Sequence, residues 1–337
     1  MDTEIHNLLA NIWFFIIGLM LFLYVVLDGF DLGVGILSLL VKDDDHRTTM
    51  MKCLESIWDA NETWLVLLGG ALFGAFPVVY SIALQALYIP VMVMLFALIF
   101  RGVAFEFRHH ANNNAPWNKV FGYSSLVAAL AQGFAFGGLI SGLSINENDY
   151  QGNVWGWLTP FSVLVAIGVA TGYTLLGATY LMMKTEGAIQ RINITQAYVA
   201  AVLEIVILIA VVNCAARLNP YFASRWADAE TGYYLDSFLV LAVFAFTMLI
   251  RSLIRGHELS AFIWSVIITL ASFTAVTIGY YPYMIPASVQ LIHGASSSRT
   301  LIFMLSTIGF LIPVMLIYSG YQYLVFRGKV KVDEHTG

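Results

Sequence analysis

The stretch WDANETWLVLLGGALF, residues 58–73, decides how this chain folds, because it places two carboxylates directly before an uncharged, largely apolar run. Of the 337 residues of the chain, 59% are hydrophobic and only 11% are charged. A soluble domain of this length does not carry so apolar a surface. The composition therefore predicts a polytopic membrane protein, and it raises the question of why one of its segments holds Asp59 and Glu62.

Apolar runs long enough to form membrane helices recur along the chain. A hydrocarbon core about 30 Å thick is crossed by about 20 apolar helical residues. Runs of this kind cover residues 12–40, 79–103, 119–143, 159–183, 196–216, 235–254, 258–280 and 300–326. A ninth candidate, 50–75, contains three acids, so its hydropathy alone leaves it undecided.

The distribution of Lys and Arg decides whether 50–75 spans the membrane, because cytoplasmic loops are enriched in these residues. With nine spans, 13 of the 16 basic residues fall on one side, whereas without the ninth span the split becomes 10 to 6. We therefore expect an all-α polytopic protein with nine transmembrane helices. The N-terminus is predicted outside and the C-terminus in the cytoplasm, with residues 1–337 forming one integral membrane domain.

The ninth segment is predicted to carry its acids on one stripe of a helix. Glu55, Asp59 and Glu62 lie at positions i, i+4 and i+7, flanked by Asn61 and Trp64. If the segment begins at about residue 50, a rise of 1.5 Å per residue puts Asp59 and Glu62 about 14–18 Å deep. That depth is close to the middle of the bilayer.

The first helix carries a second acidic pair in LDGFDLGVG, residues 27–35. Asp28 and Asp31 share one face, and Gly29, Gly33 and Gly35 are expected to let a neighbouring helix approach closely. Charges that face lipid cost several kcal/mol each. We therefore expect these acids to line a protein interior, a water path or a subunit contact, and we favour a proton path over purely structural pairing.

The segment FRGVAFEFRHH, residues 100–110, puts Arg101, Glu106 and Arg108 at the cytoplasmic end of the third predicted span. These charges have two readings. They form the mouth of a proton path, or they face lipid headgroups as helix-end charges commonly do.

Several kinds of site are excluded or disfavoured by the sequence. A net charge of −5 offers no basic patch for nucleic acid, and no spacing of Cys and His is typical of a metal site. The histidines fall in predicted loops or at predicted helix ends: His6, His46, His109, His110, His257, His293 and His335. No pair is placed to hold a haem within the bilayer, so we expect no cofactor or metal bound directly by this chain.

Long motifs in the chain resemble subunit II of the cytochrome bd family of quinol oxidases. They are LDGFDLGVG (27–35), WDANETWLVLLGGALFGAFPVVY (58–80), ALYIPVMVMLFALIFRGVAFEFR (86–108), GATYLMMKTEG (177–187) and YPYMIPAS (281–288). The residues of the motifs WDANETW and FRGVAFEFR are more similar to those of the cyanide-insensitive branch of this family. The resemblance runs from the first helix to the eighth.

The resemblance implies a fold of two four-helix bundles plus one peripheral helix, packed against a haem-bearing subunit I. The complex of such a family carries haems b and d in subunit I, oxidises quinol and reduces dioxygen to water electrogenically with protons from the cytoplasm. Small single-helix accessory subunits, quinone and lipids are further implied partners. The implied location is the bacterial cytoplasmic (inner) membrane, or an internal energy-converting membrane.

The resemblance also implies roles for particular residues. Asp59 matches the family's acid in the proton pathway, with Trp64 beside it, and position 106 is Glu where some members have Asp. The predicted proton-pathway residues are Asp28, Asp31, Glu55, Asp59, Glu62 and Glu106, and the predicted haem- or interface-facing residues are Asn61, Trp64 and Arg101.

Two other functions remain open at this point. The subunit could be an assembly scaffold whose acids pair with charges on its partner, in which case neutralising them lowers haem content and not turnover. It could instead be an independent proton-coupled transporter, although no paired discontinuous helices are visible in two matching halves.

Overall fold

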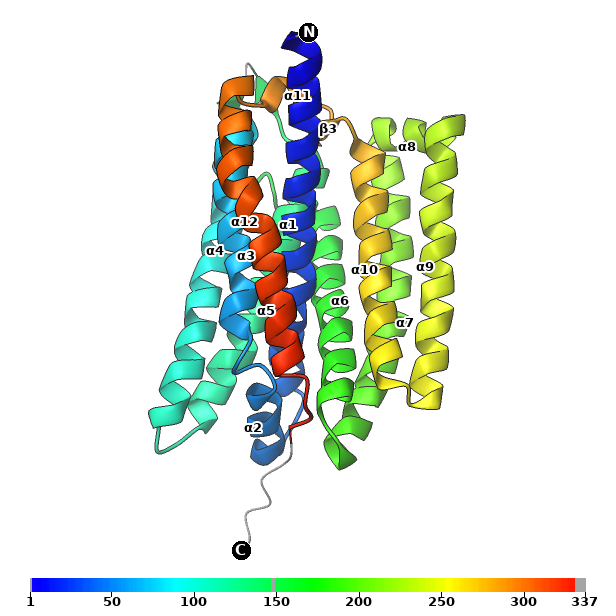
Figure 1. The fold of residues 1–337 in the computed structure, drawn as a ribbon. Helices are drawn as coiled ribbons and strands as arrows, with labels where there is room; N and C mark the ends of the chain where they lie inside the picture. The colour runs from blue at the N-terminus through cyan, green and yellow to red at the C-terminus, as the bar shows by residue number, and fades with distance from the viewer. Residues whose placement is uncertain (1, 147–148, 331–337) are drawn as a thin grey trace, which may run out of the picture.

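The structure is a computed structural model that describes residues 2–146 and 149–330, and it is built almost entirely of helices (Figure 1). The long helices are α1 (Asp2–Ser38), α3 (Trp58–Ala75), α4 (Pro77–His110), α5 (Ala115–Ile140), α6 (Pro160–Lys184), α7 (Gly187–Leu218), α9 (Ala229–Arg255), α10 (Glu258–Tyr280) and α12 (Ser298–Val325). Shorter elements are α2 (Asp44–Lys52), α8 (Pro220–Ala227), α11 (Leu291–Gly294) and two antiparallel strand pairs, β1 (Ile145–Asn146) with β2 (Asp149–Tyr150) and β3 (Tyr283–Ile285) with β4 (Val289–Gln290).

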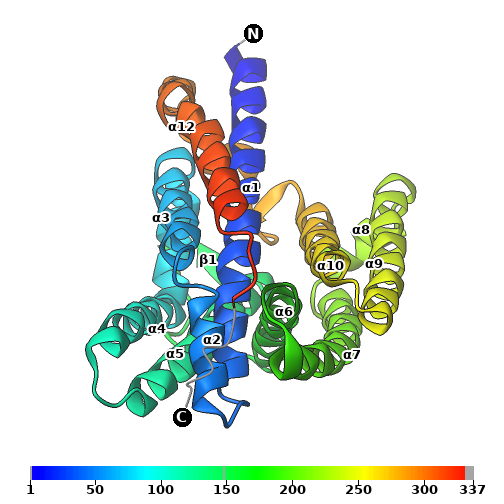
Figure 2. The ribbon, with the colours of Figure 1, turned by 60° about the horizontal axis from the view of Figure 1, so that its bottom comes forward.

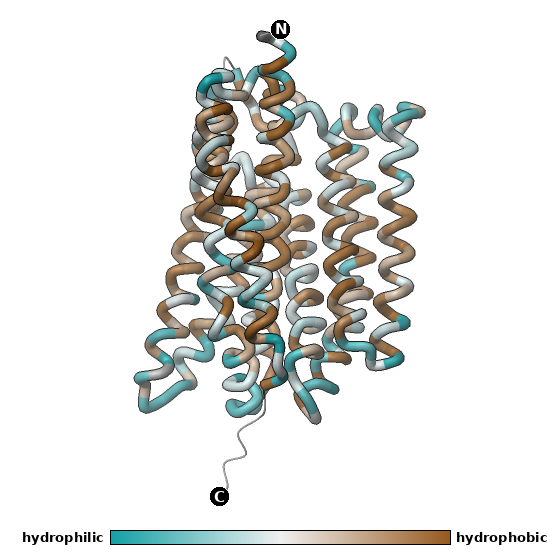
Figure 3. The backbone as a smooth tube through the Cα atoms, in the orientation of Figure 1, coloured by the Kyte–Doolittle hydropathy of each residue, from teal (hydrophilic) through white to brown (hydrophobic). Residues whose placement is uncertain are grey.

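Eight helices are long and apolar enough to cross a membrane, and they coincide with the eight spans predicted from hydropathy. Figure 3 shows apolar residues around the middle of the molecule and hydrophilic residues at both ends. The helices alternate in direction, so that α1 ends beside α2 at one end of the molecule, where α4, α6, α9 and α12 also end (Figure 1). We call this the α2 end.

The predicted continuous helix over 50–75 is wrong. Residues 44–52 form α2, the chain makes turns over 53–57, and α3 begins only at Trp58. Backbone carbonyls in the turns accept hydrogen bonds from side chains of distant helices: the Tyr180 hydroxyl donates to Cys53 O at 3.0 Å, and Gln322 Nε2 donates to Ser56 O at 2.6 Å. These external donors stabilise the turns in place of a helical ladder.

The third predicted span is longer than expected at the α2 end. It was predicted to end at 103, whereas α4 continues to His110, so Arg101 lies more than two helical turns inside the helix and not at its end. Closer to its start, α4 bends at Leu87, whose backbone is non-helical, three residues before Pro90. Proline cannot donate the helical hydrogen bond at that point, which explains the bend.

The helices form two groups around α1 and α6. One group contains α1, α3, α4 and α5, the other contains α6, α7, α9 and α10, and α12 packs on α1 and α3 (Figure 2). The central helix α1 contacts α3 and α5 in its own group and α6 in the other. Side chains from several helices therefore converge on α1.

The backbones of α1 and α6 touch where the glycines of the first helix lie. A Cβ atom added at Gly33 would lie 1.8 Å from Tyr173 O, and one added at Gly177 would lie 2.6 Å from Gly33 C. Gly29 faces the Tyr173 ring and Gly35 faces Ser125 in the same way. The predicted close approach of a neighbouring helix is confirmed, and it sets Tyr173 beside the acidic part of α1.

The short helix α2 is fixed by a side-chain cap at its start. The Asp43 carboxylate accepts hydrogen bonds from the backbone N–H groups of His46 and Asp45, and these bonds lower the pKa of Asp43. The cap orients α2 beneath the first helical group, where its buried residues Met50 and Met51 pack against the core.

The contact between α1 and α6 gives a first prediction. Gly33→Ala is expected to force the two backbones apart, because its methyl group has no space, and overpacking typically costs about 1–3 kcal/mol or more. The yield of folded protein and its melting temperature in detergent should both fall. Gly18→Ala is the matched control on the same helix, since a Cβ at Gly18 meets nothing within 4 Å. Equal stability of the two variants would contradict this account of the packing.

Candidate functional site

The centre of the candidate site is the guanidinium of Arg101, which lies inside the first helical group. Its Nη1 is 2.6 Å from Asp28 Oδ1, and both side chains are fully buried. Its Nη2 is 3.4 Å from Glu62 Oε2, and the Glu62 side chain keeps 25% of its surface exposed. One cation from α4 thus holds one acid from α1 and one from α3.

A second acid of α1 joins the cluster through an amide. Asn61 Nδ2 donates hydrogen bonds to Asp31 Oδ2 at 2.9 Å and to Leu27 O at 3.2 Å. The hydroxyl of Tyr323, on α12, donates to Asn61 Oδ1 at 2.6 Å. The amide is therefore fixed from both sides, and it presents its N–H group to the Asp31 carboxylate.

A chain of polar side chains leads from Asp28 towards the second helical group. The Tyr173 hydroxyl donates to Gln132 Oε1, and Gln132 Nε2 donates to the Tyr24 hydroxyl oxygen, each at 2.6 Å. Tyr24 lies one helical turn before Asp28 on α1, so the two side chains share a face. This branch therefore places two tyrosine hydroxyls and one amide beside the acidic face of α1.

The charges of the cluster do not balance when every group is ionised. Asp28, Asp31 and Glu62 bring three negative charges to one guanidinium. Asp28 Oδ2 and Asp31 Oδ1 are buried without a hydrogen-bond partner among the described residues. Uncompensated charge is costly in such a place, so the arrangement is suited to binding protons or water at these oxygens.

Three predicted pathway acids lie outside this cluster. Glu55 is exposed in the turns before α3, so it does not share a helical stripe with Asp59 and Glu62, and that prediction is wrong. Asp59 is in the first turn of α3 but exposed, and Glu106 is exposed on α4. The cluster therefore unites Asp28, Asp31 and Glu62 but not the other three acids.

The residues predicted to face a haem or an interface are all buried inside this chain. Asn61 and Arg101 belong to the cluster, at 1% and 0% exposure. Trp64 is also fully buried, in an apolar core that includes Trp13, and its Nε1 has no hydrogen-bond partner among the described residues.

Four residues of the site were not predicted: Tyr24, Gln132, Tyr173 and Tyr323. The spacing of Tyr24, Asp28 and Asp31 at i, i+4 and i+7 could have identified the first of them. The other three come from α5, α6 and α12, and no sequence spacing connects them to α1.

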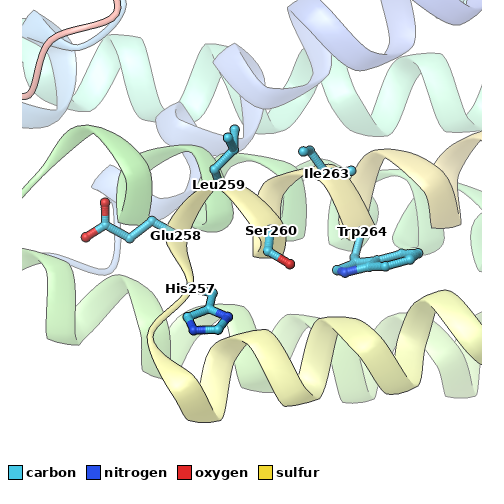
Figure 4. Close-up of a pocket in the computed structure, with 6 residues that line it drawn as sticks. All are labelled: His257, Glu258, Leu259, Ser260, Ile263 and Trp264. Carbon is cyan, nitrogen blue, oxygen red and sulfur yellow. The ribbon is translucent and has the colours of Figure 1, made fainter.

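Two hollows are present near the α2 end. A small cavity of about 70 Å³ is lined by Met51, Lys52, Glu55, Phe105 and Arg108. The other is an open groove at the turn between α9 and α10, lined by His257, Glu258, Leu259, Ser260, Ile263 and Trp264. Figure 4 shows that its side chains point in several directions and do not converge on one point. We therefore connect only the small cavity with the acid cluster.

The described histidines are spread over separate helix ends. The described histidines whose side chains can be placed are in or beside helix ends: His6, His46, His110, His257 and His293. His335 lies outside the described residues. Within the described ranges, no group of three or more His, Cys, Asp and Glu side chains is placed to hold a metal ion.

Comparisons with known proteins identify relatives of the whole chain. The model of the family described as cytochrome bd terminal oxidase subunit II matches residues 9–326. Subunit 2 of the cytochrome bd-I ubiquinol oxidase of Escherichia coli K12 is 28% identical over 98% of this chain and 97% of its own length. Subunit 2 of the cytochrome bd ubiquinol oxidase of Bacillus subtilis is 31% identical over 54% of this chain and 55% of its own.

A solved structure, that of the bd oxidase from Geobacillus thermodenitrificans, contains a chain with a similar fold. The TM-score is 0.79 at 19% identity, and the match covers 95% of this chain and 98% of the other.

The buried ion pair gives a second prediction. Arg101→Gln leaves Asp28 buried without its cation, and removing one partner of a buried pair typically costs about 3–5 kcal/mol. We expect a marked fall in the melting temperature of the purified protein. Because Asp28→Asn removes the remaining charge, the double variant should be less destabilised than the sum of the single variants. Strict additivity in this double-mutant cycle would show that the two side chains do not interact.

Proposed function

The chain belongs to the family of cytochrome bd terminal oxidase subunit II, a subunit of a quinol-oxidising oxidoreductase complex, and on this premise we propose that its buried acids take up protons for oxygen reduction. The observation that carries the proposal is the convergence of Asp28, Asp31 and Glu62 on Arg101, inside an apolar helix bundle. Ionisable groups within a membrane protein commonly mark proton or ion pathways.

The haems of the complex are assigned to the partner subunit. Family membership implies a subunit I, and the described histidines of the present chain lie at separate helix ends, which supports this assignment. We propose that this chain is haem-free, packs against the haem-bearing subunit I and stabilises it. Bound haem would supply the redox chemistry there, while the residues of this chain hold and pass protons. Small accessory subunits, quinone and lipids are further partners implied by the family.

Glu62 is the acid that we propose receives protons first. Its carboxylate is partly exposed, in contrast to the buried Asp28, and its Oε2 is 3.4 Å from Arg101 Nη2. A glutamate side chain has three rotatable bonds, so its carboxylate can turn away from the guanidinium to accept a proton. Asp28 and Asp31 lie behind it, each with one oxygen open to a proton.

The exposure of Asp59 favours an additional role for this acid in assembly with the partner subunit. Its carboxylate is exposed at the start of α3, on the same face of the helix as Val66 and Phe73, which are also exposed in the isolated chain. A charge at this position either faces lipid, at a high cost in free energy, or contacts a polar group of a partner chain. We propose that subunit I covers Asp59 and that this acid contacts the partner's side of the proton path.

The orientation in the membrane follows from the basic residues. Among the described residues, the basic side chains at the end opposite α2 are those of Arg217, Arg225 and Arg299. We propose that the α2 end faces the cytoplasm, as the positive-inside rule requires, in the bacterial inner membrane. α3, with 18 residues and a length of about 27 Å, then serves as the ninth span.

The proton role is tested with Glu62→Gln. We expect quinol-dependent oxygen uptake per haem to fall at least tenfold, because the variant cannot release a proton at position 62, while the optical haem spectrum of the complex stays intact. Glu230→Gln alters an exposed acid at the end of the molecule opposite α2, and this variant should keep full turnover. Loss of haem with unchanged turnover per remaining haem would support the scaffold function, and full turnover would refute the proton role.

The orientation is tested with single cysteines in a variant that lacks Cys53 and Cys214. A membrane-impermeant thiol reagent added to intact spheroplasts should label Arg299→Cys and leave Lys119→Cys unlabelled, because the two residues lie at opposite ends of the molecule. Permeabilised cells should show labelling of both, and the reverse pattern in intact spheroplasts would invert the proposed orientation.

A further inference from the structure

Two aromatic rings lie face to face between α3 and α4. The ring centroids of Trp58 and Phe105 are 5.3 Å apart and their planes differ by 6°. Trp58 is the first residue of α3, and Phe105 is in the last third of α4. Neither residue belongs to the acid cluster, and the proposed proton uptake does not yet explain them.

The helix spacing places this ring pair directly beside the ion pair. Trp58 lies four residues before Glu62, and Phe105 lies four residues after Arg101. Since α3 and α4 run in opposite directions, both offsets lead towards the α2 end. The rings therefore lie one helical turn, about 6 Å, nearer that end than the contact between Arg101 and Glu62.

The small cavity lies on the other side of the rings. Phe105 is one of its walls, and the remaining lining comes from Met51 and Lys52 of α2, Glu55 of the turns and Arg108 of α4. At about 70 Å³ the cavity has room for one or two water molecules beside polar groups. Along α4 the order is therefore Arg108 at the cavity, Phe105 in the ring pair, and Arg101 in the acid cluster.

The two rings differ in how firmly they are held. Phe105 is 4% exposed and packs edge-on against Phe121 of α5, with ring centroids 4.9 Å apart. Trp58 is only partly buried and follows Ile57, whose backbone is non-helical. It lies over Gly102, where a Cβ would be 3.4 Å from its ring, and it packs on the rim of the buried core. Trp58 is the less buried ring of the pair.

We propose that Trp58 and Phe105 form a gate through which protons pass from the cavity to Glu62, with Trp58 as the moving side. The stacked ring faces offer no lone pair that could carry a proton, so water must enter between the rings for a proton to pass. This inference rests on the proposed function. With the rings closed, the ion pair of Arg101 and Asp28 stays dry, and the interaction between its charges remains strong.

The experiment measures turnover of the whole oxidase complex against pH. At alkaline pH, proton arrival becomes slow because its rate follows the proton concentration. Trp58→Ala removes the moving ring, and we expect protons to reach Glu62 about tenfold faster. The alkaline half-point, which is the pH at which oxygen uptake per haem has fallen to half of its maximum, then rises by about one pH unit. Trp58→Leu serves as the second variant if the alanine variant fails to assemble.

Two controls separate gating from packing. Trp58→Phe keeps an aromatic ring and should retain the wild-type half-point. Phe107→Ala disrupts a ring pair with Trp117 on the outer side of the same helix end, also with centroids 5.3 Å apart, and it should not move the half-point. A loss of packing alone would lower yield in both alanine variants and would not raise the half-point in either.

The charged groups around Glu62 are constant across these variants. They are Asp28 and Asp31 on α1, Asp59 on α3 itself and Arg101 on α4, with Lys52, Glu55 and Arg108 around the cavity. A shift caused by Trp58→Ala therefore reports access to the cluster and not a change in its charges.

The outcomes also separate the gate from the proposed function. A half-point that stays in place or moves down in both Trp58→Ala and Trp58→Leu, with an intact haem spectrum, overturns the gate. If Glu62→Gln keeps full turnover while Trp58→Ala still shifts the half-point, the rings gate another acceptor and the proton role of Glu62 falls. If Glu62→Gln abolishes turnover and Trp58→Ala shifts the half-point, both proposals stand.

Discussion

The buried ion pair between Arg101 and Asp28 is the constraint on which the rest of the site depends. Both side chains are removed from water completely, and such a pair is tolerated only when its geometry is close and its remaining polar atoms are satisfied. The 2.6 Å contact meets the first condition. The second is met only in part, because Arg101 Nε and Asp28 Oδ2 have no hydrogen-bond partner among the described residues.

The helix arrangement explains how this pair is formed. Gly33 and Gly177 let α1 and α6 touch, and this contact brings Tyr173 and the acidic face of α1 into one layer. α4 reaches past the acids by more than two turns, so its Arg101 points into the bundle and its last turns carry Phe105 and Arg108 towards α2. The same helix thereby supplies the cation of the cluster, a wall of the cavity and one side of the ring pair.

Hydropathy and spacing predict the parts of this protein that depend on local sequence. Eight spans were placed correctly because each is a long apolar run, and the shared face of Asp28 and Asp31 follows from helical periodicity alone. The break before α3 was missed because its stabilising donors, Tyr180 and Gln322, come from helices more than 100 residues away. The position of Arg101 was missed because the end of α4 depends on packing of residues 104–110 against α2 and α5, and not on their hydropathy.

The contrast between Asp59 and Glu62 shows what kind of segment α3 is. The two acids are three residues apart on one helix, yet the Asp59 carboxylate is exposed whereas the Glu62 carboxylate contacts the buried guanidinium of Arg101. A helix that served only as a packing element would keep acids off both faces, since each costs free energy in an apolar environment. At this spacing the two carboxylates lie only about 60° apart around the helix, so together they connect the buried guanidinium with the surface of the chain. If subunit I covers Asp59 as proposed above, α3 joins a protein interface to the polar cluster, and its modest hydropathy then has a functional reason.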